Sequence, residues 1–154
     1  MLKLVIGLFI ISFSAASFAK MPIRDNEFSG FIPVINVKKS YVQEWSAELG
    51  AGIFFDENKA FSHGPYLSWE PGVKGTKAHL GYGLLKGDSD VMGQIRASVV
   101  YLEMDKKNHD YSTEENYYGL DVSVGVNLFI FSAGLFRGED SGDIEFEFAS
   151  GIGF

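Results

Sequence analysis

Serine and histidine lie close together at two places in the sequence, and these residue types could form the nucleophile and base of a hydrolase. Ser62 directly precedes His63, and His109 lies three residues before Ser112. A triad depends on geometry, and the chain contains no Gly-x-Ser-x-Gly motif, the setting of such a serine in many hydrolases. His63 leads into the turn signal Gly64-Pro65, and His109 lies in a polar stretch where solvation is expected. We therefore predict no catalytic residues, and a hydrolase stays an alternative.

Metal and cofactor chemistry finds little support in the composition. The chain contains no Cys, which excludes disulfides, thiolate metal sites and a cysteine nucleophile together. Its three histidines, at positions 63, 79 and 109, lack the short spacing of metal ligands. The acidic runs Asp56-Glu57 and Asp88-Ser89-Asp90 could attract divalent cations, but such runs are typical of solvated loops. We predict neither a metal site nor a bound cofactor.

The charge balance argues against nucleic acid as a partner. The chain has 13 Lys and Arg residues against 20 Asp and Glu residues, which gives a net charge of −7. Binding to phosphates requires clustered basic residues. The pairs Lys38-Lys39 and Lys106-Lys107 are too short to form such a cluster.

The elements that would position these residues are β-strands. Polar and apolar residues alternate with a period of two, which places successive side chains on opposite faces of a strand. An abundance of Gly (18) and Phe (14) with only 4 Pro also favours β structure with tight turns. Seven segments carry the alternation clearly: 44–53, 66–73, 77–84, 95–101, 118–128, 131–135 and 144–154.

An eighth strand is predicted over Phe31 to Lys38, although Pro33 restricts it to an edge, a strand start or a bulge. The longest polar loop runs from Asp105 to Asn116, and tight turns are expected at Lys74-Gly75 and over 139–143. Short strands separated by turn signals, with no helical period between them, favour antiparallel up-and-down order. The predicted fold class is therefore all-β, an antiparallel up-and-down β-barrel of eight strands.

Alternation alone does not decide which face of the sheet points inward. A soluble barrel encloses its apolar residues, whereas a membrane barrel turns them toward lipid and keeps polar and small residues in its lumen. Two features favour the membrane arrangement: the polar face is rich in Gly, which suits a crowded lumen, and aromatic residues lie near strand ends, where interfacial girdles need them. Those aromatic residues are Trp45, Tyr101, Tyr117, Tyr118 and Phe154.

In a membrane barrel, the polar face would carry a set of charged residues into the lumen: Glu44, Glu48, Glu70, Lys77, His79, Arg96, Asp121, Glu145 and Glu147. This set could form an acidic binding site or a general acid–base pair. It could also form an ion-paired, hydrogen-bonded core, because the interior of an eight-stranded barrel is barely wide enough for side chains. Buried charge is costly unless it is paired, so we favour the paired core.

The first 19 residues have the three-part layout of a secretory signal peptide. A basic start at Lys3 is followed by an apolar run and then by small residues that end in Ala19. The apolar run is shorter than the roughly 20 residues that a membrane-spanning helix needs. We therefore predict a signal peptide over 1–19, a flexible lead-in over 20–30 and a barrel domain over 31–154.

The C-terminal segment resembles a known class of strand. Phe146, Phe148, Ile152 and the terminal Phe154 place apolar residues at alternate positions, with Ser150 as the exception. This pattern resembles the last strand of Gram-negative outer-membrane β-barrel proteins. The resemblance implies contact with outer-membrane lipid and recognition by the barrel-assembly machinery through the strand that ends at Phe154. With this strand running toward the periplasm, the loop over 105–116 would be extracellular, and the connections over 56–61 and 86–92 would be periplasmic.

The sequence thus predicts a small, non-enzymatic outer-membrane barrel with a structural or surface-interaction role and a lumen filled by side chains. Two alternatives stay open. An outer-membrane enzyme that modifies lipid would need a catalytic geometry among the residues above. A soluble periplasmic barrel that binds an apolar ligand inside would need the opposite facing of the sheet. The sequence identifies no ligand, substrate or oligomeric state.

Overall fold

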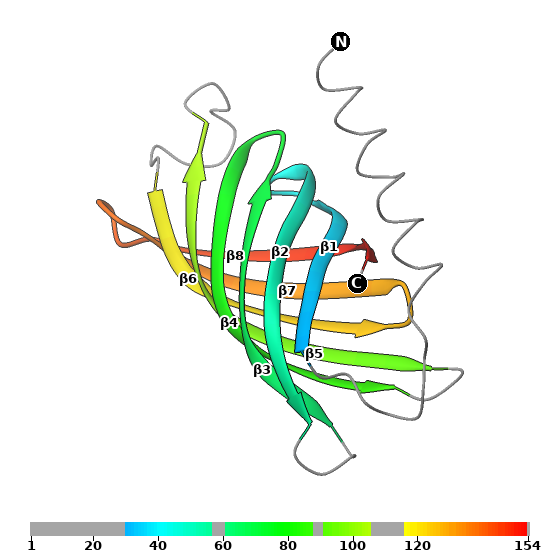
Figure 1. The fold of residues 1–154 in the computed structure, drawn as a ribbon. Helices are drawn as coiled ribbons and strands as arrows, with labels where there is room; N and C mark the ends of the chain where they lie inside the picture. The colour runs from blue at the N-terminus through cyan, green and yellow to red at the C-terminus, as the bar shows by residue number, and fades with distance from the viewer. Residues whose placement is uncertain (1–29, 57–60, 88–90, 106–115, 154) are drawn as a thin grey trace.

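The computed structural model describes residues 30–56, 61–87, 91–105 and 116–153. It confirms the predicted fold class, because eight antiparallel strands follow one another in order and close into a barrel (Figure 1). The strands are β1 (Gly30–Ser40), β2 (Glu44–Asp56), β3 (Ser62–Pro71), β4 (Gly75–Gly87), β5 (Met92–Met104), β6 (Asn116–Val126), β7 (Phe129–Gly138) and β8 (Ile144–Gly153). The predicted first strand lies within β1. The segment 1–29 and Phe154 lie outside the described residues, which contain no helix long and apolar enough to cross a membrane.

The two ends of the barrel differ in their connections. The hairpin end carries the turns over 41–43, 72–74 and 139–143, and β5 ends and β6 begins there. The terminus end carries Gly30, the turn over 127–128 and Gly153. Asn127 has a φ of 54°, the left-handed conformation that Asn tolerates in tight hairpin turns. Its backbone N–H donates to the carbonyl of Met92 at 2.7 Å, which fastens this turn to the start of β5.

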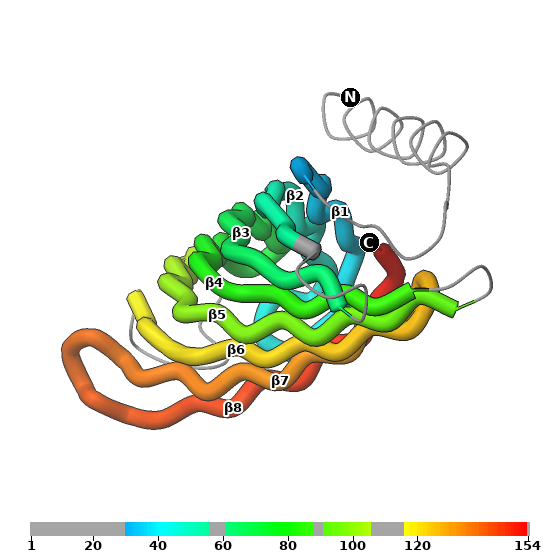
Figure 2. Tube along the Cα trace, turned by 60° about the horizontal axis from the view of Figure 1, so that its bottom comes forward, coloured from blue at the N-terminus to red at the C-terminus, as the bar shows by residue number. Residues whose placement is uncertain are grey.

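The rows of paired residues climb toward the hairpin end as they pass around the barrel. A row that starts at Gly30 returns to β1 at Ser40, ten residues further along, after crossing Phe54, Gly64, Gly83, Arg96, Ser123, Ser132 and Ala149. A stagger of this kind accompanies strands tilted by about 35–45° to the barrel axis. Figure 2 shows neighbouring strands lying side by side in this order. The seam between β8 and β1 is short, with five paired residues on each strand.

The apolar face of the sheet points outward. Large apolar side chains on all eight strands are exposed, among them Leu80 at 60% and Val99 at 54%. The polar side chains between them are almost completely buried, with Glu48 at 1% and His79 at 2%. This arrangement is the reverse of a soluble barrel, and it is the facing that the Gly-rich polar face predicted.

Glycine on the inner face makes room for the large side chains that fill the lumen. A Cβ atom at Gly81 would clash with the carbonyl of Ala97 and the ring of Tyr66. A Cβ atom at Gly134 would clash with the ring of Phe136. Because Tyr66 and Phe136 are buried, the glycine content of this face reflects close packing inside the barrel.

Two residue predictions were wrong, each because of local backbone geometry. Glu44 does not enter the lumen, because it leaves the β1–β2 turn with a φ of 60° and pairs at the surface with Lys74 at 3.1 Å. Tyr117 does not belong to an outer aromatic girdle. It precedes the exposed Tyr118, and successive side chains of a strand face opposite sides, so Tyr117 is buried in the lumen.

Candidate functional site: the charged lumen and the outer wall

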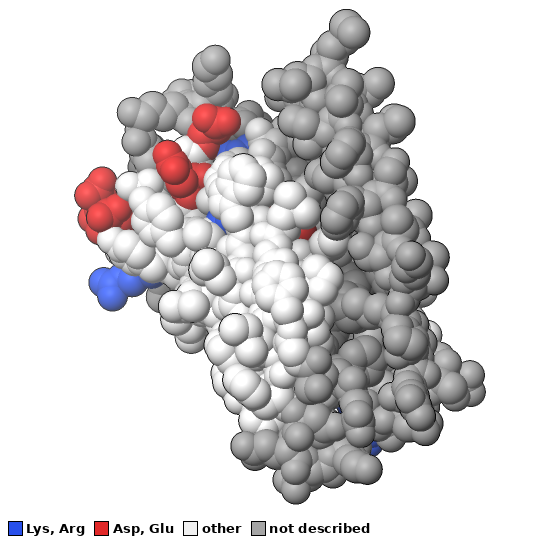
Figure 3. All heavy atoms as spheres, in the orientation of Figure 1, with Lys and Arg blue, Asp and Glu red and all other residues white. Residues whose placement is uncertain are grey.

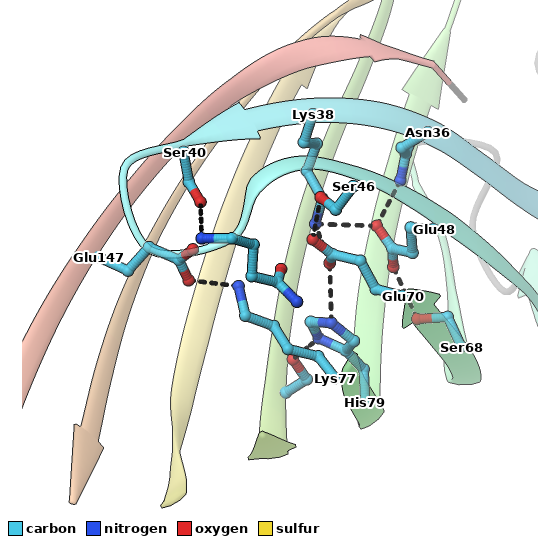
Figure 4. A network of polar contacts seen from close by, with 12 residues as sticks. Asn36, Lys38, Ser40, Ser46, Glu48, Ser68, Glu70, Lys77, His79 and Glu147 are labelled. Atoms are coloured by element: carbon cyan, nitrogen blue, oxygen red, sulfur yellow. Dashed lines mark hydrogen bonds and ion pairs between the residues drawn. The ribbon is translucent and has the colours of Figure 1, made fainter. Parts of the chain in front are cut away.

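The carboxylate of Glu48 lies at the centre of a buried polar network in the middle of the lumen (Figure 4). It accepts from Lys38 Nζ at 3.2 Å and from the two terminal nitrogens of Arg96 at 3.1 and 3.3 Å. Asn36 Nδ2 and Ser68 Oγ also donate to it, each at 2.6 Å. The two-pronged contact with Arg96 is the strongest geometry for an ion pair of this kind. Strands β1, β2, β3 and β5 are thereby joined across the lumen.

Glu70 on β3 extends this network toward β4. It pairs with Lys38, accepts from Ser46 Oγ at 2.6 Å and lies 3.0 Å from His79 Nε2. The other ring nitrogen of His79 lies 3.3 Å from Ser98 Oγ. Lys38 therefore bridges two carboxylates in the middle of the barrel.

The role of Lys38 was missed in the sequence, where it was noted only as part of a short basic pair. Its position in β1 contained the signal that could have found it. Lys38 shares a face with Asn36 and Ser40, whereas Val37 and Lys39 lie on the other face. A lysine on the polar face of a strand is expected to enter the lumen.

A second ion pair ties β4 to β8. Lys77 Nζ donates to one carboxylate oxygen of Glu147 and lies 5.4 Å from the centre of the Phe136 ring. The other oxygen of Glu147 is buried without a hydrogen-bond partner. Seven of the nine charged residues predicted for the lumen are buried: Glu48, Glu70, Lys77, His79, Arg96, Asp121 and Glu147. Glu145 is half-buried, and Glu44 is the surface residue described above. The predicted paired core is confirmed for the pairs named here.

Apolar side chains close the lumen on both sides of the charged layer. At the terminus end the cluster consists of Ile32, Phe54 and Leu85, with Met92 packed against it. At the hairpin end it consists of Val42, Val100, Leu102, Tyr117 and Phe136, with Met104 packed against it. The β1–β2 turn folds inward at this end, where the fully buried Gln43 donates from Nε2 to the Gly75 carbonyl at 3.1 Å.

Ser98, His79 and Glu70 have the serine–histidine–carboxylate order of a hydrolase triad, although sequence reasoning did not select them. Their setting does not favour catalysis. All three side chains are buried, and Glu70 also pairs with Lys38. A substrate would have to pass one of the two apolar clusters to reach the Ser98 hydroxyl. The same contacts fit a structural polar network.

The serine–histidine pairs noted in the sequence do not form a site in the described part of the chain. Ser62 points into the lumen, whereas the next residue, His63, lies on the outer wall and hydrogen-bonds the hydroxyl of Tyr82. Neighbouring residues of a strand face opposite sides, so these two side chains cannot act together. His109 and Ser112 lie outside the described residues.

Metal binding is not indicated where the structure is described. No group of three or more His, Asp or Glu side chains is arranged to hold an ion within those residues. Glu48 and Glu70, the carboxylates in the middle of the lumen, are occupied by Lys38 and Arg96. Residues 57 and 88–90, which belong to the acidic runs of the sequence, lie outside the described ranges.

The outer wall carries a belt of polar and aromatic side chains near the hairpin end. Lys39 Nζ lies 5.5 Å from the ring centre of Trp45 on the neighbouring strand. Tyr101 and Tyr118 are directly paired, with their ring centres 6.2 Å apart. Figure 3 shows charged side chains gathered toward this end, while the middle of the visible wall is almost entirely uncharged.

A further contact between a cation and an aromatic ring lies on the outer wall near the terminus end, where Lys86 Nζ is 5.2 Å from the ring centre of Phe61. On the outer face of β4, Thr76 and Lys86 mark the two limits of an apolar stretch that contains Leu80 and Leu84. Ten steps of about 3.3 Å along a strand tilted by about 40° span about 25 Å of barrel height. This height matches the apolar band of about 25 Å found on membrane barrels.

An apolar groove of about 730 Å³ runs over β2, β3 and β4 within this band. Gly50, Ala51 and Ala78 are small, and the larger Leu67 and Trp69 stand beside them. The groove therefore suits hydrocarbon chains better than a polar ligand.

Comparison with known proteins does not identify a family for this chain. The chain matches no family model, no curated protein sequence and no solved structure.

Proposed function

We propose that this protein is a small outer-membrane β-barrel with a structural or surface-interaction role and a lumen plugged by paired side chains. The observation that carries the proposal is the outer wall, on which large apolar side chains of all eight strands are exposed. The largest apolar patches on soluble monomers cover only about 300–600 Å². A continuous apolar band around the molecule requires lipid or a partner of similar extent to cover it.

Closure of the sheet supports a membrane setting. A bilayer core offers no water to an unpaired N–H or C=O group, so spanning structures made of strands must be closed. Each strand here pairs with two neighbours over at least part of its length, and the ring is closed by β8 and β1. Strands of 10 to 13 residues, with β1 and β6 at 11, are long enough to cross.

The lumen favours a structural or interacting protein over the two alternatives. A soluble barrel with an apolar ligand inside would need an apolar interior, whereas the middle of this lumen holds Lys38, Glu48 and Arg96. A lipid-modifying enzyme would need catalytic groups that lipid can reach, whereas Ser98 and His79 are buried. Side chains that brace the strands from within leave the outer wall and the two ends as the surfaces on which the protein would act.

Cell fractionation tests this proposal. The full chain expressed in a Gram-negative host should be recovered in the outer-membrane fraction. On a gel it should migrate differently before and after boiling, because a closed barrel resists unfolding by detergent. A soluble periplasmic protein and a soluble reporter fused to residues 1–19 serve as controls for the fractions. Recovery of the folded chain in the soluble periplasmic fraction would contradict the proposal.

A further inference from the structure

The first half of β8 has an edge that no described strand covers. β8 pairs with β7 from Ile144 to Ile152, but it pairs with β1 only from Ala149 onward. The pairing with β1 stops at Ser40, because the chain then turns and buries Val42 and Gln43 in the lumen. Residues 144–148, termed here the β8 edge, therefore have β7 on one side and no strand of the described chain on the other.

The backbone of the β8 edge can bind a further strand. The hydroxyl of Tyr41 donates to the carbonyl of Phe146, so this carbonyl points toward the seam. In an antiparallel strand the N–H and C=O of one residue point to the same side, and alternate residues share that side. Ile144 and Phe148 therefore also direct backbone groups to the edge. A row of donors and acceptors that pairs with no strand on this side is a template for strand addition, and an added strand would replace the Tyr41 hydroxyl at the Phe146 carbonyl.

The side chains of the β8 edge alternate between two chemical characters. Ile144, Phe146 and Phe148 point outward, and Phe148 is 68% exposed. Glu145 and Glu147 lie on the opposite face; one oxygen of the buried Glu147 pairs with Lys77, and its other oxygen has no hydrogen-bond partner. A strand added here would therefore meet apolar side chains on one of its faces and carboxylates on the other.

The surroundings of the edge are acidic and lie at the hairpin end. Ile144 belongs to the row that contains Arg137, Tyr118 and Tyr101, and rows climb toward this end from β5 to β8. The edge therefore begins beyond the belt formed by the two tyrosines. The adjoining turn carries Glu139, Asp140 and Asp143, and Figure 3 shows acidic side chains at the projecting tip of the β7–β8 hairpin.

We propose that the β8 edge binds an extended segment of another protein by strand addition, and that this segment alternates apolar residues with Lys or Arg. The assignment rests on the proposed membrane setting, in which the edge begins beyond the tyrosine belt at Ile144 and runs into the apolar band at Phe148, whose row contains Val122. Backbone hydrogen bonds would hold the segment in place. Its alternation of apolar and basic residues would distinguish it from other extended segments. Its apolar residues would lie beside Phe146 and Phe148, and its basic residues would face Glu145 and Glu147.

A second copy of this chain is a poor occupant of the same edge. Two β8 edges side by side would bring Glu145 and Glu147 of both copies together, and like charges on opposing strands destabilise the pairing. The uncovered part of β1 does not complement the edge either. It starts at Gly30 at the terminus end, on the far side of the bilayer, and Pro33 lacks an N–H donor.

Peptide binding to the full-length barrel in detergent micelles tests this inference. One fluorescent peptide alternates four lysines with three valines, and a second has the same composition with the lysines and valines in two blocks. Anisotropy titrations should give about tenfold tighter binding for the alternating peptide. Backbone amide NMR signals of Ile144, Phe146 and Phe148 should shift more than those of Glu145 and Glu147, whose amides face β7. Equal binding of the two peptides would overturn the inference, since it would indicate charge attraction alone.

Two matched variants locate the binding. Phe146→Pro removes the side chain and the edge N–H donor, whereas Phe146→Ala removes only the side chain. The proline variant should bind the alternating peptide about tenfold more weakly than the alanine variant. Gel mobility before and after boiling shows whether each variant is folded. Unchanged binding in a folded Phe146→Pro barrel would contradict strand addition. If the wild-type barrel enters the outer membrane but binds neither peptide, this inference fails while the proposed function stands.

Discussion

The lumen and the outer wall of this barrel use the same alternating strands in different ways. In the lumen, the central charged groups meet particular partners: Glu48 is held by Lys38 and Arg96 within 3.3 Å. On the outer wall, apolar side chains such as Leu80 and Val122 are exposed and depend on what surrounds the molecule. Stability therefore comes from specific pairing inside and from the nature of the solvent outside. A substitution in the lumen should change the stability of the barrel in any medium. The effect of a substitution on the outer wall should depend on whether lipid is present.

The largest effect is expected from breaking the central ion pair. Glu48→Gln leaves Arg96 buried without its carboxylate partner, and removal of one partner of a buried pair costs about 3–5 kcal/mol. The surface pair of Glu44 and Lys74 provides the control, since Glu44→Gln should change the free energy of unfolding by only about 0–1 kcal/mol. Denaturant titrations of both variants in detergent measure the difference. Similar costs for the two variants would mean that the lumen network contributes no more than a surface pair.

The next effect tests the medium around the outer wall. Val122→Arg places a charge in the apolar band, where arginine near the bilayer midplane costs about 2–4 kcal/mol. Tyr118→Arg, on the same strand at the hairpin-end belt, should cost about 0–1 kcal/mol. Folding titrations in lipid vesicles compare the two variants. On a wall that faces water, both would behave as ordinary surface substitutions within about 0.5 kcal/mol of each other.

Much of the fold could be predicted because alternation is a strong signal when both faces of a strand are chemically distinct. The segments 77–84 and 118–126, in which apolar residues alternate strictly with polar or small ones, lie within β4 and β6. Strand ends were less predictable. Val73 keeps the outward character of β3 but belongs to a turn in which Gly72 N–H donates to the Gly75 carbonyl at 2.7 Å. At such positions the backbone conformation of the turn, and not the character of the side chain, decides where the strand ends.

The site could be predicted in kind but not in its pairings. The alternation placed Glu48, Glu70 and Arg96 on the inner face, but the register between strands decides which of them meet. Arg96 on β5 reaches Glu48 on β2 across the lumen, and no sequence spacing expresses this contact. The serine and histidine that do lie together, Ser98 and His79, are on neighbouring strands and 19 residues apart.

A smaller effect is expected at the β1–β8 seam, where the two regions meet. A Cβ atom at Gly151 would clash with the Val37 carbonyl, so Gly151→Ala should cost about 1–3 kcal/mol by overpacking. Gly93→Ala is the matched control, because the nearest atom to its added Cβ lies at 3.8 Å. Thermal unfolding in detergent compares them. An equal midpoint for the two variants would show that the seam is looser than the contacts of Gly151 imply.

The smallest effect on stability is expected from deletion of the terminal Phe154. One side chain contributes at most about 1–3 kcal/mol by burial, and a closed barrel retains its other contacts. The C-terminal strand would nevertheless be read as an unfolded tail by the assembly machinery. The deletion should therefore lower the amount of barrel in the outer membrane of cells, while the purified protein still refolds in detergent. Deletion of the non-aromatic residue Lys20 is the control, and normal insertion without Phe154 would refute its role in recognition.

Fluorescence quenching of the two tryptophans by brominated lipids tests the central claim, that the outer wall faces lipid. Trp45 and Trp69 are the two tryptophans of the chain, and both are more than half exposed on this wall. Trp69 pairs with Leu49, four residues further into β2 than Trp45, so it should lie deeper in the bilayer. The variants Trp45→Phe and Trp69→Phe isolate each signal. Bromine near the middle of the acyl chains should quench Trp69 more strongly, and bromine near the headgroups should quench Trp45 more strongly. Quenching of both by acrylamide in water, with no effect of brominated lipid, would contradict the claim.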